Sequence, residues 1–263
     1  MRGVGAIAAT LALPAACACA QVMVTLRPRP DVSQSLFIEG MGEASPKAVA
    51  ILYSGGYGVV RLRMEDGVPK FQEGNFLVRS RGEFIRNGVL PVVVDVPSDW
   101  SGGESDRYRR SDEQATDARA VLAEIGRRYP GTPVFVVTTS RSTLSGAYLG
   151  RALGPGEIGG VVLSSSMVAP GHGWESLVGF DFKAVRVPLL FVHHRDDGCK
   201  ATPYYGAESA ARGFALVSVS GGLPATSGPC EPFAAHGFYG KEAAVIDAVA
   251  AWMLKKPFAT EIH

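Results

Sequence analysis

Short runs of apolar, often β-branched residues alternate along the chain with longer segments whose apolar residues recur at helical spacing. The short runs are typical of strands, and they lie at 48–53, 90–96, 133–139, 159–163, 188–193 and 214–220. Because these runs are almost continuously apolar, we expect both faces of each strand to be covered, as in a parallel sheet. Two earlier segments, 22–26 and 35–38, predict an antiparallel start.

The longer segments predict helices between these strands, at 75–87, 112–129, 143–153, 203–212 and 241–254. For the second of them, Ser111 can cap the start while Gln114 reaches back, and Pro130 with Gly131 ends it. The alternation predicts an α/β fold, a doubly wound and mostly parallel β-sheet with helices on both faces. Ligands of such sheets bind beyond the carboxyl ends of the strands, so functional residues should follow strands.

The first twenty residues have the pattern of an export signal. Arg2 precedes an apolar stretch at 4–13, and small residues at 18–20 suit a cleavage site. We therefore expect a signal peptide at 1–20, a single domain at 21–263 and a periplasmic or secreted location. No later stretch is apolar for long enough to predict a membrane span. Lipid attachment at Cys17 or Cys19 is the less favoured alternative.

Removal of that signal would leave Cys199 and Cys230 as the remaining cysteines. In an oxidising compartment two such residues most simply form one disulfide, while two buried free thiols are the alternative. The charge is nearly balanced, with 26 Lys and Arg against 25 Asp and Glu, so a nucleic-acid partner is not expected. The basic pairs at 109–110 and 127–128 are interpreted as solvated surface.

The stretch TTSRST, residues 138–143, crosses from a predicted strand into a predicted helix. Ser140 comes directly after the strand, where a helix N-terminus can stabilise negative charge, whereas Ser142 and Ser145 lie further into the helix. Ser140 is therefore the candidate nucleophile. The alternative is that these serines only cap the helix, as Ser and Thr commonly do.

A serine hydroxyl needs a base to remove its proton and an acid to orient that base. His236 lies in a Gly- and Pro-containing loop before the last helix, and Asp196 and Asp197 lie in the turn after strand 188–193. We favour Asp197 over Asp196, and either could instead form only a turn. A metal site from His193, His194 and Asp197 is not favoured, because no metal-binding spacing supports it, and no cofactor is expected.

The segments TTSRST, HHRDDGC and PCEPFAAHGF, taken in this order, resemble the α/β-hydrolase fold superfamily. Within it they are similar to exported bacterial serine hydrolases of the dienelactone-hydrolase-like branch. The resemblance implies Ser140 as nucleophile, Asp197 as acid and His236 as base. The family's usual nucleophile turn is Gly-x-Ser-x-Gly, and this chain has Thr138 and Ser142 in place of the two glycines.

The same resemblance implies an oxyanion hole in the glycine-rich stretch ILYSGGYGVV, formed by the amide of Gly56 or Tyr57 together with that of Arg141. A Cys199–Cys230 bridge would then tie the loop of the acid to the loop of the base. Residues 164–187 are expected to form a short lid-like cover, and 98–112 another wall.

The expected activity is hydrolysis of small-molecule carboxylic esters through an acyl-enzyme. An amide or thioester hydrolase with the same triad is the nearest alternative. A catalytically inactive exported binding protein on a hydrolase scaffold is the other.

Overall fold

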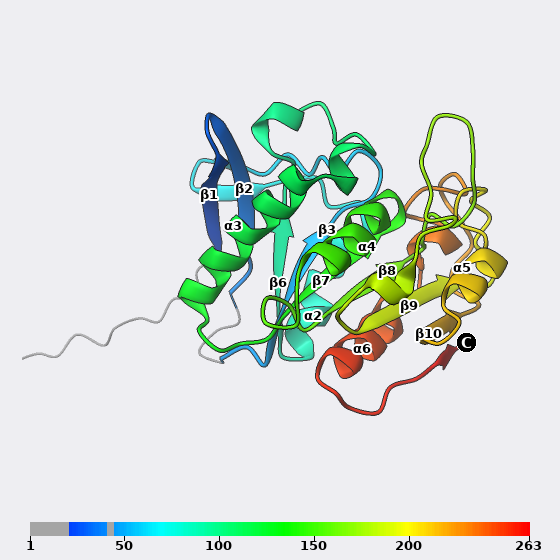
Figure 1. The fold of residues 1–263 in the computed structure, drawn as a ribbon. Helices are drawn as coiled ribbons and strands as arrows, with labels where there is room; N and C mark the ends of the chain where they lie inside the picture. Colours follow the sequence, from blue (N-terminus) through cyan, green and yellow to red (C-terminus); the bar gives the residue numbers. More distant parts are fainter. Residues whose placement is uncertain (1–20, 41–44) are drawn as a thin grey trace, which may run out of the picture.

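The computed structural model describes residues 21–40 and 45–263, so the predicted signal peptide lies outside the described residues. Their main feature is one nine-stranded sheet, drawn in Figure 1, with the spatial order β1-β2-β6-β3-β7-β8-β9-β10-β11. In chain order its strands are β1 (Val22–Arg29), β2 (Val32–Ile38), β3 (Ala48–Tyr53), β6 (Val89–Val94), β7 (Val134–Thr139), β8 (Gly160–Ser164), β9 (Leu189–His194), β10 (Ala215–Val219) and β11 (Glu261–Ile262).

The pairing of these strands confirms the predicted mostly parallel sheet with an antiparallel start. β1 pairs antiparallel with β2, and β2 antiparallel with β6. All the other neighbours, from β6 and β3 to β10 and β11, pair parallel. The carboxyl ends of the central parallel strands therefore meet at one edge of the sheet, which is where ligands bind in this class of fold.

Helices cover both faces of the sheet, as predicted. The helices are α1 (Phe76–Arg79), α2 (Arg81–Arg86), α3 (Asp112–Arg128), α4 (Thr143–Ala152), α5 (Tyr204–Ala210) and α6 (Glu242–Met253). Residues of α3 and α4 share one buried apolar cluster with the sheet, and residues of α1, α2 and α6 share the other. In Figure 1, α3 and α4 lie in front of the strands, whereas α2 and α6 are drawn at the lower edge and behind them.

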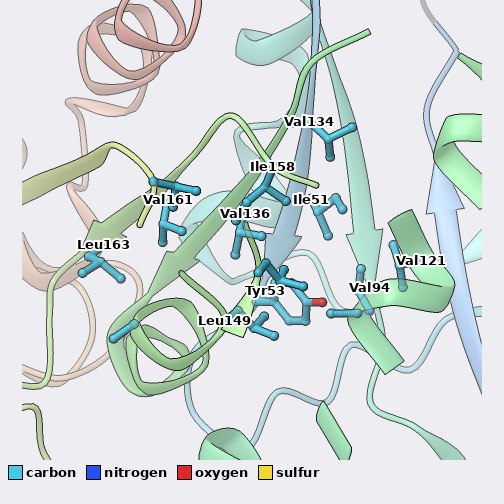
Figure 2. Packing of buried hydrophobic residues seen from close by; sticks show 14 of the residues in the cluster. Ile51, Tyr53, Val94, Val121, Val134, Val136, Leu149, Ile158, Val161 and Leu163 are labelled. Carbon is cyan, nitrogen blue, oxygen red and sulfur yellow. The ribbon is translucent and has the colours of Figure 1, made fainter. Parts of the chain in front are cut away.

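Alternate residues of β3 pack into the apolar clusters on the two faces of the sheet. Val49, Ile51 and Tyr53 belong to the cluster under α3 and α4, whereas the residues between them belong to the other cluster. Figure 2 shows Ile51 and Tyr53 beside Val136 of the neighbouring strand β7, with Val121 of α3 nearby. All six residues of β3 are buried, which explains the unbroken apolar run in the sequence.

The predicted helix at 75–87 is divided in the structure at Ser80 into α1 and α2. Phe76, Leu77 and Val78 are all buried in α1, and three consecutive residues cannot lie on the same face of one helix. After the break, Phe84 of α2 is buried as well.

Three short strands escaped the sequence patterns. They are β11 at the sheet edge and the separate hairpin of β4 (Arg63–Glu65) with β5 (Val68–Lys70). Each has two or three residues, too few to show a period.

The predicted start of α3 is confirmed in part. Ser111 Oγ accepts the Gln114 N–H at 3.2 Å, but the Gln114 side chain donates to Ser145 Oγ instead of reaching back. Within the described ranges, no helix has both the length and the apolar character needed to cross a bilayer.

Candidate active site

Ser140 lies in the turn where β7 ends, at the first position of a short 3-10 helix, Ser140–Ser142, that leads directly into α4. Its φ of +55° is in the left-handed region, which a residue with a Cβ adopts rarely and which recurs at functional sites. Ser142 and Ser145 are completely buried, while Ser140 is partly exposed and lines a cavity. Among the three candidate serines, the structure presents Ser140 to that cavity.

His236 lies in another 3-10 turn, Ala235–Gly237, and its ring contacts the carboxylate of Asp197. Nδ1 of His236 is 3.0 Å from Oδ2 and 3.3 Å from Oδ1 of Asp197. The Asp196 side chain is 75% exposed and lies 4.0 Å from Nδ1 of His194. The structure therefore brings Asp197, and not Asp196, to His236.

The carboxylate of Asp197 is held by two further donors. The Cys199 N–H donates to its Oδ1 at 3.0 Å, and the Thr202 hydroxyl donates to its Oδ2 at 2.9 Å. Thr202 Oγ1 is also 3.1 Å from Nδ1 of His236. The backbone carbonyl of His236 accepts a hydrogen bond from Ser165 Oγ at 2.7 Å. Sequence reasoning missed Thr202 and Ser165, because neither belongs to a local motif that marks it as a partner of a distant histidine.

The two histidines at the end of β9 use their ring nitrogens to support nearby backbone. Nε2 of His193 lies 2.7 Å from the Thr202 carbonyl oxygen, and Nε2 of His194 lies 2.8 Å from that of Gly221. Burial lowers the pKa of His193, so its neutral form is favoured. No cluster of three or more His, Cys, Asp or Glu suited to a metal ion occurs in the described part of the chain.

Cys199 and Cys230 form the predicted disulfide, with their Cα atoms 4.6 Å apart. Cys199 is two residues after Asp197 and Cys230 is six before His236, so the bridge joins the loop of the carboxylate to the loop of the imidazole. Cys230 also lines the cavity. The covalent link thus lies at the border of the site.

The cavity has a volume of about 630 Å³ and is lined by residues of five segments, which contribute residues 54–61, 72 with 74–76, 101–102, 139–140, and 230–232 with 236–237. Ser140 and His236 are both among its lining residues. Nε2 of His236 is buried and has no hydrogen-bond partner among the described residues, Ser140 Oγ included. Residues 101 and 102 come from the predicted wall 98–112, whereas 164–187 contributes no lining residue. Its role as a lid stays a prediction.

Comparison with known proteins gives no match to a family model and no match to a curated protein sequence. Solved structures do match. An α/β serine hydrolase without a lid from Xanthomonas campestris is 14% identical over 84% of this chain and 91% of its own, with a TM-score of 0.57. Est1E from Butyrivibrio proteoclasticus, solved with bound ferulic acid, is 13% identical over 89% and 98%, with a TM-score of 0.60. A putative α/β hydrolase from Agrobacterium tumefaciens is 16% identical over 88% and 94%, with a TM-score of 0.58.

The chain has the α/β-hydrolase fold. The nucleophile turn of that fold usually has two glycines, and the structure shows how this chain accommodates Thr138 in place of the first. Thr138 is fully buried and its hydroxyl donates to the Val162 carbonyl at 2.8 Å. The facing residue of α4 is Gly146, where a Cβ would lie 2.7 Å from Thr138 Oγ1. A glycine on the helix thus provides the space that a glycine on the strand usually provides in the α/β-hydrolase fold.

Ser142, in place of the second glycine of the α/β-hydrolase fold, makes polar contacts that join the ends of β3 and β7. Its hydroxyl donates to the Tyr53 carbonyl at 2.7 Å and accepts the Thr139 N–H at 2.9 Å. The chain after Tyr53 then passes very close to Ser140, because a Cβ at Gly55 would lie 2.9 Å from the Cβ of Ser140. Sequence reasoning named Gly56 and Tyr57 in this loop and missed the steric requirement at Gly55.

The loop after β3, which carries the oxyanion-hole candidates in the α/β-hydrolase fold, is a tight turn closed by a hydrogen bond from the Gly58 N–H to the Gly55 carbonyl at 3.0 Å. Gly56 has a φ of +59°, and both Gly56 and Tyr57 line the cavity. The third candidate, Arg141, follows Ser140 in the 3-10 helix. Its guanidinium forms two hydrogen bonds to the Asp106 carboxylate, at 2.6 and 2.8 Å.

Arg109 lies beneath this loop, and its interpretation as solvated surface was wrong. Its side chain is 0% exposed and pairs with Glu104, with 3.1 Å between Nη1 and Oε2. Burial raises the pKa of the Glu104 carboxyl, and the charge of Arg109 opposes that shift. Nη2 of Arg109 donates to the Gly56 carbonyl at 3.0 Å. A basic pair in a sequence carries no signal that only its first member is buried.

Proposed function

We propose that this protein is a serine hydrolase that cleaves carboxylic esters of small molecules through an acyl-enzyme. Ser140 is the nucleophile, His236 the general base and acid, and Asp197 the residue that orients the imidazole. The observation that carries the proposal is the state of the His236 ring. Its Nδ1 contacts the Asp197 carboxylate, while its Nε2 has no partner among the described residues, in a side chain that lines the same cavity as Ser140.

The chemistry follows from these positions. Asp197 accepts a hydrogen bond from Nδ1–H and thereby keeps Nε2 unprotonated, so that Nε2 can take the proton of Ser140 Oγ as this oxygen attacks the ester carbonyl. The same nitrogen then returns the proton to the leaving alcohol. In the second half-reaction a water molecule takes the place of the serine hydroxyl and releases the acid. The hydrogen bond between Oγ and Nε2 has to form when substrate binds, as is common for unliganded enzymes.

The negative charge that develops on the carbonyl oxygen needs N–H donors close to Ser140. The Arg141 N–H lies in the first turn of a 3-10 helix, where backbone N–H groups lack partners within the helix. The second donor comes from the Gly56 to Tyr57 stretch, which approaches Ser140 through the close contact at Gly55. In other acyl-transfer enzymes one such donor contributes about 3 kcal/mol to the stability of the transition state.

The size and the setting of the site support a small-molecule substrate. A cavity of about 630 Å³ lies within the range of small-molecule sites. The proposal requires no metal ion and no cofactor. The disulfide is compatible with work outside the cytoplasm, which the predicted signal peptide also favours.

The experiment that tests this proposal combines ester turnover with covalent labelling. We expect the protein to hydrolyse p-nitrophenyl acetate and to react with a fluorophosphonate probe at Ser140, located by peptide mass spectrometry. Ser140→Ala should lower kcat by a factor on the order of 10⁶ and abolish labelling, with an unchanged melting temperature. Ser209→Ala, at an exposed serine on α5 outside this cavity, is the matched control and should retain both activities. Turnover retained by Ser140→Ala, or a protein inactive on both short and long acyl esters, contradicts the proposal.

A further inference from the structure

The peptide group between Gly56 and Tyr57 has a carbonyl and an N–H that serve different partners. The Gly56 carbonyl accepts the hydrogen bond from Arg109, a residue that is fully buried and does not line the cavity. No peptide bond among the described residues is cis, so the Tyr57 N–H points in the direction opposite to that carbonyl. This N–H is therefore directed away from Arg109, and both residues of the peptide, Gly56 and Tyr57, line the cavity.

We infer that Arg109 is a positioning residue that selects the Tyr57 N–H, rather than the Gly56 N–H, as the oxyanion donor. This inference rests on the proposed function and deepens it. Arg109 does not touch the substrate. It acts through one peptide group, by holding the carbonyl of that group inward and thus its N–H outward.

Glu104 completes the support of this turn. It pairs with Arg109 at 3.1 Å, and its own backbone N–H donates to the Tyr57 carbonyl at 2.9 Å. The turn lies directly against the ion pair, because a Cβ at Gly58 would be 3.0 Å from Glu104 Oε2 and 3.1 Å from Arg109 Nη2. The peptide group before Tyr57 is therefore held by the Arg109 side chain and the one after it by the Glu104 backbone, and Gly58 permits the close approach of the ion pair.

The charge of Arg109 matters as well as its position. A guanidinium forms stronger hydrogen bonds than a neutral donor, and a hydrogen bond to a carbonyl polarises its peptide group in a surrounding of low polarity. The Tyr57 N–H thus becomes a better donor to an oxyanion. A buried ion pair is costly to desolvate and is weak evidence for stability, so a role in orienting the turn explains its presence better than stabilisation of the fold.

The first test changes Arg109 while keeping its charge. Arg109→Lys retains an ion pair with Glu104 but loses the planar fork that reaches Glu104 and Gly56 together. An interaction made only in the transition state affects kcat and not KM. We expect kcat for p-nitrophenyl acetate to fall about tenfold with an unchanged KM. Arg110→Lys is the matched control, because Arg110 is in the same turn and pairs with Glu175 near the surface, and it should match the wild type.

The second test removes the donor itself. Proline has no N–H and requires a negative φ, and Tyr57 is not among the residues with positive φ. Tyr57→Ala removes the same side chain but keeps the N–H. We expect kcat of Tyr57→Pro to be 10²- to 10³-fold below that of Tyr57→Ala, in the range found for loss of one oxyanion donor. Equal kcat values for the two variants overturn the assignment of this N–H.

The third test combines the two changes. If Arg109 acts through the Tyr57 N–H, Arg109→Lys should lower kcat in the wild-type background and have no further effect in Tyr57→Pro. The same tenfold loss in both backgrounds, or a change in KM alone, overturns the positioning role. If one single variant does not fold, the comparison that uses the other decides. A wild type that lacks ester turnover and labelling refutes the proposed function as well, whereas an active wild type with additive effects refutes only this inference.

Discussion

Two walls of the proposed site hold the candidate catalytic groups by different physical means. The nucleophile wall comprises residues 55–58 and 138–142, and the acid–base wall comprises residues 197–202 and 230–237. Ion pairs support the nucleophile wall, with Arg109 and Glu104 under the turn and Arg141 with Asp106 beside it. A disulfide and hydrogen bonds from Thr202 and the Cys199 N–H support the acid–base wall.

The difference follows from the chain around each wall. The nucleophile wall is formed at the ends of two adjacent central strands, β3 and β7, so the sheet itself brings its parts together. The acid–base wall consists of two loops that are 39 residues apart at Asp197 and His236. Such loops have no sheet ladder to fix them, and a covalent bond between them limits their relative motion. The comparison predicts that loss of a supporting ion pair weakens the nucleophile wall, whereas reduction of the disulfide weakens the acid–base wall.

The largest effect is expected at the centre of the acid–base wall. Asp197→Asn should keep the shape of the side chain but favour the wrong tautomer of His236, and kcat should fall by about 10⁴, as in other serine enzymes with this change. Asp196→Asn is the matched control, since that side chain is 75% exposed, and its kcat should equal the wild-type value. Steady-state kinetics on p-nitrophenyl acetate measure both. Equal losses in the two variants would show that the carboxylate has been assigned wrongly.

Removal of the disulfide should have the next largest effect. The bridge closes a loop with a sequence separation of 31, and the chain-entropy relation gives about 3 to 4 kcal/mol of stability for a loop of this length. We expect the double variant Cys199→Ser with Cys230→Ser to lose about this free energy of unfolding in urea, and to lose kcat severalfold because Asp197 and His236 become less well ordered. The wild type treated with a reductant should behave in the same way. An unchanged kcat and an unchanged unfolding midpoint would show that the disulfide supports neither the stability of the protein nor the order of Asp197 and His236.

The smallest effect is expected for the ion pair between Arg141 and Asp106 in the nucleophile wall. Burial acts to raise the pKa of Asp106, but hydrogen bonds from Arg141 and from the Glu175 N–H outweigh it, so this pKa is lowered. A lowered pKa in the folded state contributes stability above the unfolded pKa, near 4, and the contribution is lost as the pH falls through the folded value.

This stability is measured by comparing Asp106→Asn with the wild type in urea at several pH values. The pair is partly exposed, so we expect a loss of about 0.5 to 1 kcal/mol at pH 7. The difference between the two proteins should persist down to about pH 5 and shrink below about pH 4. A difference that does not change with pH would show that the carboxylate acts through packing and not through its charge.

The amino-acid sequence by itself determined the succession of strands and helices, because apolar periodicity reports how each segment meets the core. β3 is the clear example, with all six residues buried on alternating faces. The residue types and their order along the chain also indicated Ser140, His236 and a carboxylate after β9 as candidate site residues before any geometry was known. The pairing of Cys199 with Cys230 could be predicted because they are the two cysteines left after removal of the signal peptide, and the structure confirms it.

Only the tertiary structure decided which groups meet across distant segments. It brought Asp197 rather than its neighbour to His236, buried Arg109 beneath the turn after β3 and put Gly146 against Thr138. Such outcomes depend on what lies opposite a residue in space, and a pattern along the chain records only what lies next to it. Burial of one charge in a basic pair, or of one hydroxyl among several, is for this reason set by packing between elements and not by the local sequence.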